Sequence, residues 1–138
     1  MVAMMQQHDE SVRVLLGEPR EQEPPPGQQR RRGLRVAFEQ QERFDTIVAD
    51  DGPAVLRIVE HGGIDLVVLD VNLAPMGGLR TLRILRDINQ WLPVILTSRA
   101  WTRHLLSEAL HFEASSVLQI PVDLDTLLRT VQRLLMEK

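Results

Sequence analysis

Short runs of apolar residues recur along the chain and are separated by segments with helical spacing. The runs predict β-strands at residues 12–16, 46–49, 64–69, 94–97 and 117–120. The third and fourth runs are apolar almost throughout, which is typical of strands in a parallel sheet whose two faces are both covered. The pattern therefore predicts a sheet of five strands with helices between them.

The intervening segments predict helices at residues 31–43, 52–61, 78–91, 103–113 and 124–136. The last is the clearest, because its leucines and Val131 fall on one face and Asp123 is placed to cap its first turn. Strands that alternate with helices imply right-handed crossovers. The expected fold class is therefore α/β, a doubly wound five-stranded parallel sheet.

The chain divides into an N-terminal tail, residues 1–11, and a single domain, residues 12–138. Within the domain, residues 21–29 read EQEPPPGQQ, and three consecutive prolines followed by Gly27 exclude a helix interior. We interpret this segment as an extended surface insertion after the first strand. Its role does not follow from the sequence.

Composition narrows the function classes. The net charge of -3 and the few aromatic residues argue against nucleic-acid binding, and the absence of cysteine excludes thiol chemistry and disulfides. No stretch approaches the roughly 20 apolar residues of a membrane span, and no signal peptide is evident. We expect a cytoplasmic protein that binds neither nucleic acid nor membrane.

Several segments, taken in order, resemble the receiver domain of bacterial response regulators. DLVVLDVNLAPMGG resembles the phosphoacceptor segment, which would make Asp70 the acceptor and Asn72 a backbone ligand of magnesium. PVILTS places Thr97 at the switch hydroxyl, and EASSVLQIP resembles the last strand with its following proline, Pro121. The resemblance implies a flavodoxin-like receiver topology and a role in two-component signal transduction, including phosphorelays.

The departures from that family bear on the chemistry. Where the family carries an acidic pair for magnesium, this chain has Leu16 and Gly17, or Gly17 and Glu18 in the alternative register. The family's lysine is replaced by Ile120, and Lys138 is the only lysine of the chain. Phosphoryl transfer to a carboxylate needs cationic groups and a metal held by oxygen ligands. We therefore expect a pseudo-receiver pocket formed by Gly17, Glu18, Asn72, Ile120 and Pro121, with no metal and no other cofactor.

Other polar clusters are interpreted as structural. Asp50 and Asp51 are expected in the turn and cap after the second strand, because too few residues separate them from Asp70 for a metal pair. His104, Glu108 and His111 are spaced to share one helix face, which we interpret as solvated. The same holds for two arginine groups, residues 30–35 and Arg80, Arg83 and Arg86, with acidic partners as the alternative.

Two receiver functions remain, and one enzymatic alternative. The first is an atypical receiver, not an enzyme, that acts through protein–protein interaction without efficient aspartyl phosphorylation. The second is a phosphorelay receiver phosphorylated on Asp70 by a histidine kinase; only this reading needs Mg²⁺, for which Glu18, Asp70 and Asn72 are the candidate ligands. A phosphatase-like hydrolase is the minor alternative, because Asn72 cannot act as an acid or base.

The expected partner is a protein, either a sensor kinase, an output protein or a second copy of the chain. Its identity, the stimulus, the oligomeric state and the phosphorylation of Asp70 in vivo are beyond the sequence. Restoring Asp at positions 16 and 17 together with Lys at 120 is expected to be the minimum change that would permit phosphorylation.

Overall fold

The structure is a computed structural model of the 138-residue chain, and it describes residues 11–19 and 33–136. Its sheet contains the strands β1 (Val12–Gly17), β2 (Phe44–Ala49), β3 (Leu66–Asp70), β4 (Val94–Ser98) and β5 (Ser116–Gln119). All pairings are parallel, and the spatial order is β2-β1-β3-β4-β5. The predicted doubly wound sheet with flavodoxin-like topology is therefore confirmed.

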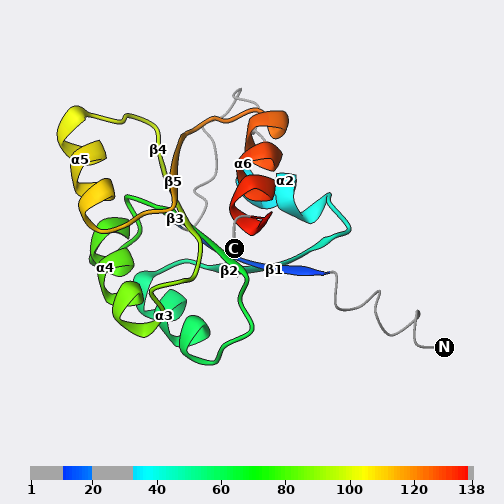
Figure 1. Ribbon diagram of the computed structural model, residues 1–138, viewed down its shortest axis with the longest axis horizontal. Coiled ribbons are helices and arrows are strands. Elements are labelled where there is room, and N and C mark those ends of the chain that lie inside the picture. The colour runs from blue at the N-terminus through cyan, green and yellow to red at the C-terminus, as the bar shows by residue number, and fades with distance from the viewer. Residues whose placement is uncertain (1–10, 20–32, 137–138) are drawn as a thin grey trace, which may run out of the picture.

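Helices cover both faces of the sheet (Figure 1). They are α2 (Leu34–Glu39), α3 (Gly52–Glu60), α4 (Gly78–Ile88), α5 (Arg103–His111) and α6 (Leu124–Met136). Alternate strand residues point to opposite faces, so the core divides in two. One cluster joins Leu15, Val67 and Leu69 to the side of α3, α4 and α5, and the other joins Val14, Leu16 and Val68 to the side of α2 and α6.

The predicted element types are correct, while several boundaries differ. In the described part of the first predicted helix, helical geometry is limited to α2, which ends at Glu39 before a turn that leads into β2. The predicted helix 78–91 ends earlier, at Ile88. The physical reason is Asn89, whose side-chain oxygen accepts hydrogen bonds from the backbone N–H groups of Trp91 and Leu92.

Helix caps agree with the sequence interpretation. The Asp51 carboxylate accepts a 2.7 Å hydrogen bond from Ala54 N at the start of α3. The Asp123 carboxylate accepts a 2.8 Å hydrogen bond from Thr126 N in the first turn of α6. Both acids satisfy backbone donors that have no partner within their helix.

The N-terminal tail up to residue 10, the Pro-rich insertion and Arg30 to Arg32 lie outside the described residues. Within the described ranges, no helix is long and apolar enough to cross a membrane.

Candidate functional site

The predicted site lies at the carboxyl edge of the sheet, where β1, β3 and β4 end side by side. Asp70 is the last residue of β3, and the register places it beside Thr97 of β4. Parallel strands present their carboxyl ends at one edge, where ligands bind in open α/β sheets. The structure thus brings the acceptor-like carboxylate and the switch-like hydroxyl together.

Asp70 is partly exposed, whereas Thr97 is almost fully buried, with 1% of its surface accessible. One carboxylate oxygen of Asp70 accepts a 2.8 Å hydrogen bond from the backbone N–H of Asn72. Thr97 donates its hydroxyl to the Leu69 carbonyl at 3.5 Å, a long bond. Among the described residues, no arginine forms an ion pair with Asp70.

The loop after Asp70 is held by backbone hydrogen bonds. Leu73 N donates to the Asp70 carbonyl at 3.1 Å, and Gly78 N donates to the Val71 carbonyl at 2.9 Å. Gly78 lies so close to β3 that a Cβ atom there would overlap the carbonyl oxygen of Asp70. Gly77, with φ of 85°, adopts the left-handed conformation that favours glycine. The glycine pair therefore fixes the carboxyl end of β3, a role that the sequence reading missed.

At the acidic-pair positions the structure has an apolar interior. Leu16 is 1% exposed and belongs to the core cluster that includes Phe38 and Val68. Gly17 is buried on the opposite face of the sheet. A Cβ at Gly17 would lie 2.8 Å from Leu69 Cδ2, 2.9 Å from Val55 Cγ2 and 3.2 Å from Leu73 Cδ2. The space beside Gly17 is therefore occupied by hydrocarbon.

Leu73 is the residue at this site that sequence reasoning overlooked. It is fully buried, and its side chain reaches the space beside Gly17. Because the loop after Asp70 is mostly apolar, the sequence offers no signal that singles out Leu73. Its side chain helps to fill the space that a side chain at position 17 would occupy.

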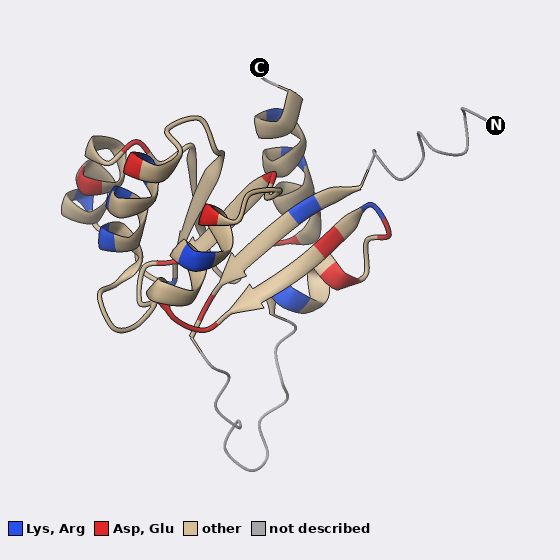
Figure 2. Cartoon of the chain, turned by 90° about the horizontal axis from the view of Figure 1, so that it is seen from below, with Lys and Arg blue, Asp and Glu red and all other residues tan. Residues whose placement is uncertain are grey.

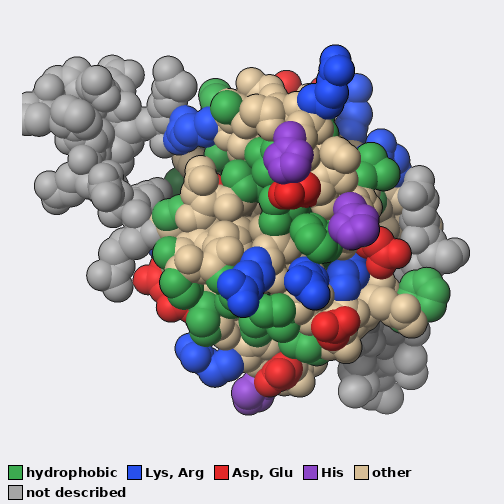
Figure 3. Space-filling view, turned by 90° about the vertical axis from the view of Figure 1, so that its left-hand side faces the viewer, with side chains coloured by type: hydrophobic (Ala, Val, Ile, Leu, Met, Phe, Trp, Pro, Cys, Tyr) green, Lys and Arg blue, Asp and Glu red, His purple; other side chains and the backbone are tan. Residues whose placement is uncertain are grey.

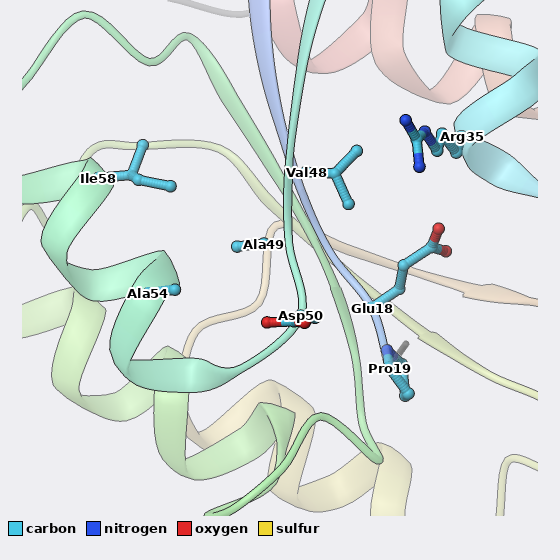
Figure 4. Close-up of a pocket in the computed structure, with 8 residues that line it drawn as sticks. All are labelled: Glu18, Pro19, Arg35, Val48, Ala49, Asp50, Ala54 and Ile58. Carbon is cyan, nitrogen blue, oxygen red and sulfur yellow. The ribbon is translucent and has the colours of Figure 1, made fainter. Parts of the chain in front are cut away.

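Glu18, the carboxylate that directly follows β1, lies in a different environment. It lines a cavity beside β2, and its carboxylate points toward the side on which Arg35 lies (Figure 4). Within the described ranges, no three acidic, histidine or cysteine side chains are grouped closely enough to hold a metal ion. The described residues around Asp70 therefore do not fit the magnesium site that the family resemblance implies.

The other pocket residues lie around the same edge without adding charge to it. Ile120 is partly buried and packs against the α2/α6 core cluster, and its backbone N donates to the Ser98 carbonyl at 2.9 Å. Pro121 and the Asn72 side chain are exposed. Val117 of β5 packs against the other core cluster.

Trp101 lies in the loop that follows β4. Its indole N–H donates a 2.9 Å hydrogen bond to the Leu118 carbonyl, and its ring packs against the same core cluster as Val117. The loop between β4 and α5 is therefore joined to β5 by an aromatic residue that does not belong to a strand.

The histidine group forms no metal site in the described structure. His104 Nε2 lies 3.1 Å from a Glu108 carboxylate oxygen one turn away; the His104 side chain is largely exposed and that of Glu108 is partly exposed. His111 is also exposed and stacks edge-on against Phe112. These contacts fit a solvated helix face.

The arginines of α4 are not equivalent, which corrects the expectation of a uniformly solvated row. Arg80 and Arg83 are exposed, but Arg86 is half-buried. Its guanidinium donates to the carbonyls of Leu92 at 2.7 Å and of Glu113 at 2.8 Å, and thus joins the ends of α4 and α5. Burial lowers the pKa of Arg86 from its ordinary value, and the nearby Glu113 opposes that shift.

The face seen over α3, α4 and α5 has mixed chemistry (Figure 3). Basic side chains cross its middle, with acidic, histidine and apolar side chains on either side. The view shows no uniform positive patch of the kind that nucleic-acid phosphates require.

Comparison with known proteins assigns the family. The profile of the response regulator receiver domain matches residues 28–132, and this chain therefore belongs to the response-regulator receiver-domain family of two-component signalling. The match begins after β1, the strand that ends with Leu16 and Gly17.

Individual relatives agree with this assignment. The chain is 30% identical over 92 residues to the transcriptional regulatory protein ZraR of Escherichia coli, covering 67% of this chain and 21% of ZraR. It is 33% identical over 105 residues to the regulatory protein AtoC of Escherichia coli, covering 76% of this chain and 23% of AtoC. The chain thus matches about a fifth of the length of these relatives.

A CheY-like receiver-domain structure from Methanospirillum hungatei superposes with a TM-score of 0.76 at 16% identity. The alignment covers 92% of this chain and 95% of that chain. At this identity the likeness supports the fold alone.

Proposed function

We propose that this chain is a receiver module that signals through protein–protein contacts without efficient phosphorylation of Asp70. The observation that carries the proposal is the apolar filling at Leu16 and Gly17, the positions of the family's acidic pair. Leu16 and Gly17 bring no carboxylate, and the side chains of Leu69, Val55 and Leu73 occupy the space next to Gly17.

The physical argument concerns charge. Transfer of a phosphoryl group to a carboxylate brings several negative oxygens together. Stabilisation of these oxygens by cations and metal ions makes the largest contribution to lowering the activation free energy. Ile120 cannot supply a positive charge, and the Glu18 carboxylate points toward the side on which Arg35 lies. Asp70 then retains a structural function, because its carboxylate accepts the Asn72 N–H and holds the following loop.

The phosphorelay reading is the second candidate, and one observation favours it. Asp70 is partly exposed and lies beside Thr97 in the register, so both groups that the reaction would use are present. Under that reading the cations would have to come from groups other than the described residues around Asp70.

Intact-mass spectrometry tests the proposal. The protein is incubated with acetyl phosphate and magnesium, and an Asp70→Asn variant and a phosphorylatable receiver domain serve as controls. We expect no stable adduct of about 80 Da on wild type, the mass of one phosphoryl group. A magnesium-dependent adduct that is absent from Asp70→Asn would refute the proposal.

The partner surface proposed for this module is the face formed by α5, β5 and α6. Leu106 is 40% exposed and Leu110 is 79% exposed, a large amount for leucines on neighbouring turns of one helix. Gln119, Arg129 and Gln132 are exposed on β5 and α6. Exposed apolar side chains with a polar rim are typical of protein interfaces. Loss of partner capture by a Leu106→Ser, Leu110→Ser variant that unfolds like wild type would support this surface; unchanged capture would contradict it.

A further inference from the structure

The open edge of the sheet at β2 has the features of a peptide-binding site. β2 is the terminal strand of the sheet and pairs along its whole length with β1. In the described sheet β2 pairs with no second strand, and Figure 2 shows it at the edge beside β1. Such an edge presents unpaired backbone groups that an extended chain can pair with.

The ladder register identifies those backbone groups. Val12 N donates to the Arg43 carbonyl at 2.8 Å, and Glu18 N donates to the Ala49 carbonyl at 3.1 Å. In a parallel ladder, alternate residues of a strand bond to opposite sides. The odd-numbered residues of β2 therefore bond to β1, while the N–H and C=O groups of Thr46 and Val48 point outward.

A groove lies at the carboxyl end of this edge and reaches both faces of the strand (Figure 4). Its volume is about 550 Å³, and its walls include Val48 on the α2 side and Ala54 and Ile58 of α3 on the other. Val48 is 37% exposed. On the α2 side the groove is also lined by Arg35.

An added strand would use both features. Its backbone would bond to Thr46 and Val48, and its alternating side chains would enter the groove from the two faces of the sheet. This combination of main-chain bonds for affinity and side-chain pockets for specificity defines recognition by strand addition.

The acidic side chains near β2 favour a positively charged peptide as the added strand. Among the described residues that flank β2, acidic side chains outnumber basic ones: Glu18, Glu39, Glu42, Asp45, Asp50 and Asp51 against Arg13, Arg35 and Arg43. Several of these form ion pairs, as in Arg13–Asp45 and Arg35–Glu39, and Glu18 and Asp50 also have interaction partners. A second copy of β2 would add its own Asp45 and Asp50 to this surface, and like charges close together are destabilising.

We propose that the β2 edge binds an extended, basic peptide segment of a partner protein by strand addition. Apolar residues of the segment fill the groove beside Val48 and Ile58, and a lysine or arginine lies near the exposed acidic side chains that flank β2, Glu42 and Asp45 among them. This surface lies on the opposite edge of the sheet from β5. It is therefore independent of the α5, β5 and α6 face and of the chemistry of Asp70.

The probe is a fluorescent ten-residue peptide with alternating valine and threonine and a lysine at each end. Binding is measured by fluorescence anisotropy, and amide hydrogen exchange of the protein is measured by NMR with and without the peptide. We expect at least tenfold slower exchange at Thr46 and Val48 in the complex, because their outward N–H groups become hydrogen-bonded. The same peptide N-methylated at alternate residues, which keeps its side chains but loses its donors, should bind at least fivefold more weakly.

Val48→Pro is the informative variant, because it removes an outward N–H without removing a bond to β1. It should weaken peptide binding at least fivefold, while Val48→Thr, which keeps the N–H and the β-branched shape, should bind within twofold of wild type. If Val48→Pro does not fold, the exchange data on wild type and the N-methylated peptide still decide the question.

Four results would overturn the proposal. The first two are unchanged amide exchange at Thr46 and Val48 and equal binding of the N-methylated peptide. The third is equal or tighter binding of an otherwise identical peptide with glutamate in place of lysine. The fourth is self-association of the protein through β2, detected by analytical ultracentrifugation. Peptide binding that appears only after residues 21–29 are replaced by a Gly/Ser connector would also overturn it, since the occupant would then be this chain itself.

Discussion

Restoring the family's acidic pair is the perturbation that tests the account of the site most directly. The sequence alone suggested that Leu16→Asp and Gly17→Asp, with Ile120→Lys, would permit phosphorylation. The structure predicts instead that the two aspartates prevent folding, because neither position opens toward Asp70. Leu16 is 1% exposed in one core cluster, and Gly17 faces the other.

The expected magnitude follows from the surroundings of each residue. Leu16→Asp loses about 2 kcal/mol of apolar burial and places an unpaired carboxylate in the core, which costs about 3–5 kcal/mol. Gly17→Asp forces a Cβ to within 2.8 Å of Leu69 Cδ2 and 2.9 Å of Val55 Cγ2, an overpacking that costs about 1–3 kcal/mol. The total is comparable to the whole stability of a small domain, about 5–15 kcal/mol.

Urea unfolding followed by circular dichroism, at pH 7 and pH 4, is the appropriate measurement. Burial raises the pKa of the introduced carboxyl group above its unfolded value, so its charge penalty is fully present at pH 7 and decreases as the pH falls toward the unfolded pKa of about 3.9. Leu16→Asp should therefore recover stability at pH 4 relative to the matched variant Leu16→Asn, which has no charge to titrate.

The opposite outcome would be informative. If the Leu16→Asp, Gly17→Asp protein unfolds at the wild-type urea concentration, or acquires a magnesium-dependent adduct on Asp70, the two positions must open toward the site. The interpretation of an apolar, closed pocket would then be wrong. Ile120→Lys alone, at a partly exposed position, should cost far less than the acidic pair.

Three further predictions concern the scaffold. Arg86→Met should lower the free energy of unfolding by about 2–3 kcal/mol in urea titrations, because the carbonyls of Leu92 and Glu113 lose a charged donor; a loss below about 0.5 kcal/mol would contradict this. Glu113→Gly should raise the melting temperature, since Glu113 has φ of 63° and glycine adopts that conformation without strain; an unchanged or lower value in calorimetry would show that its charge near Arg86 matters more. The Thr126 backbone N–H lowers the pKa of Asp123, so the stability that this carboxylate contributes is present above its unfolded pKa of about 3.9 and is lost as the pH falls through the folded value; urea midpoints between pH 6 and 2 should therefore fall more for wild type than for Asp123→Asn, and parallel curves would argue against it.

The sequence by itself determined the elements, their order and the edge of the sheet at which Asp70 and Thr97 meet. Those features depend on local periodicity and on the parallel arrangement that alternating strands and helices impose. The caps at Asp51 and Asp123 could be predicted for the same reason, since a cap involves residues three positions apart. Helix ends were less predictable, because the Asn89 turn competes with helical hydrogen bonding.

Only the tertiary structure decided what surrounds Asp70. Leu16 and Gly17 face opposite core clusters, and Leu73 reaches the space beside Gly17. Both features depend on how the strands and helices pack against one another. The sequence spacing of Arg80, Arg83 and Arg86 likewise suggested one solvated row. Arg86 is distinguished only by the carbonyls that the folded chain places around it, from residues up to 27 positions away. Side-chain contacts over such separations are set by packing, which local patterns do not specify.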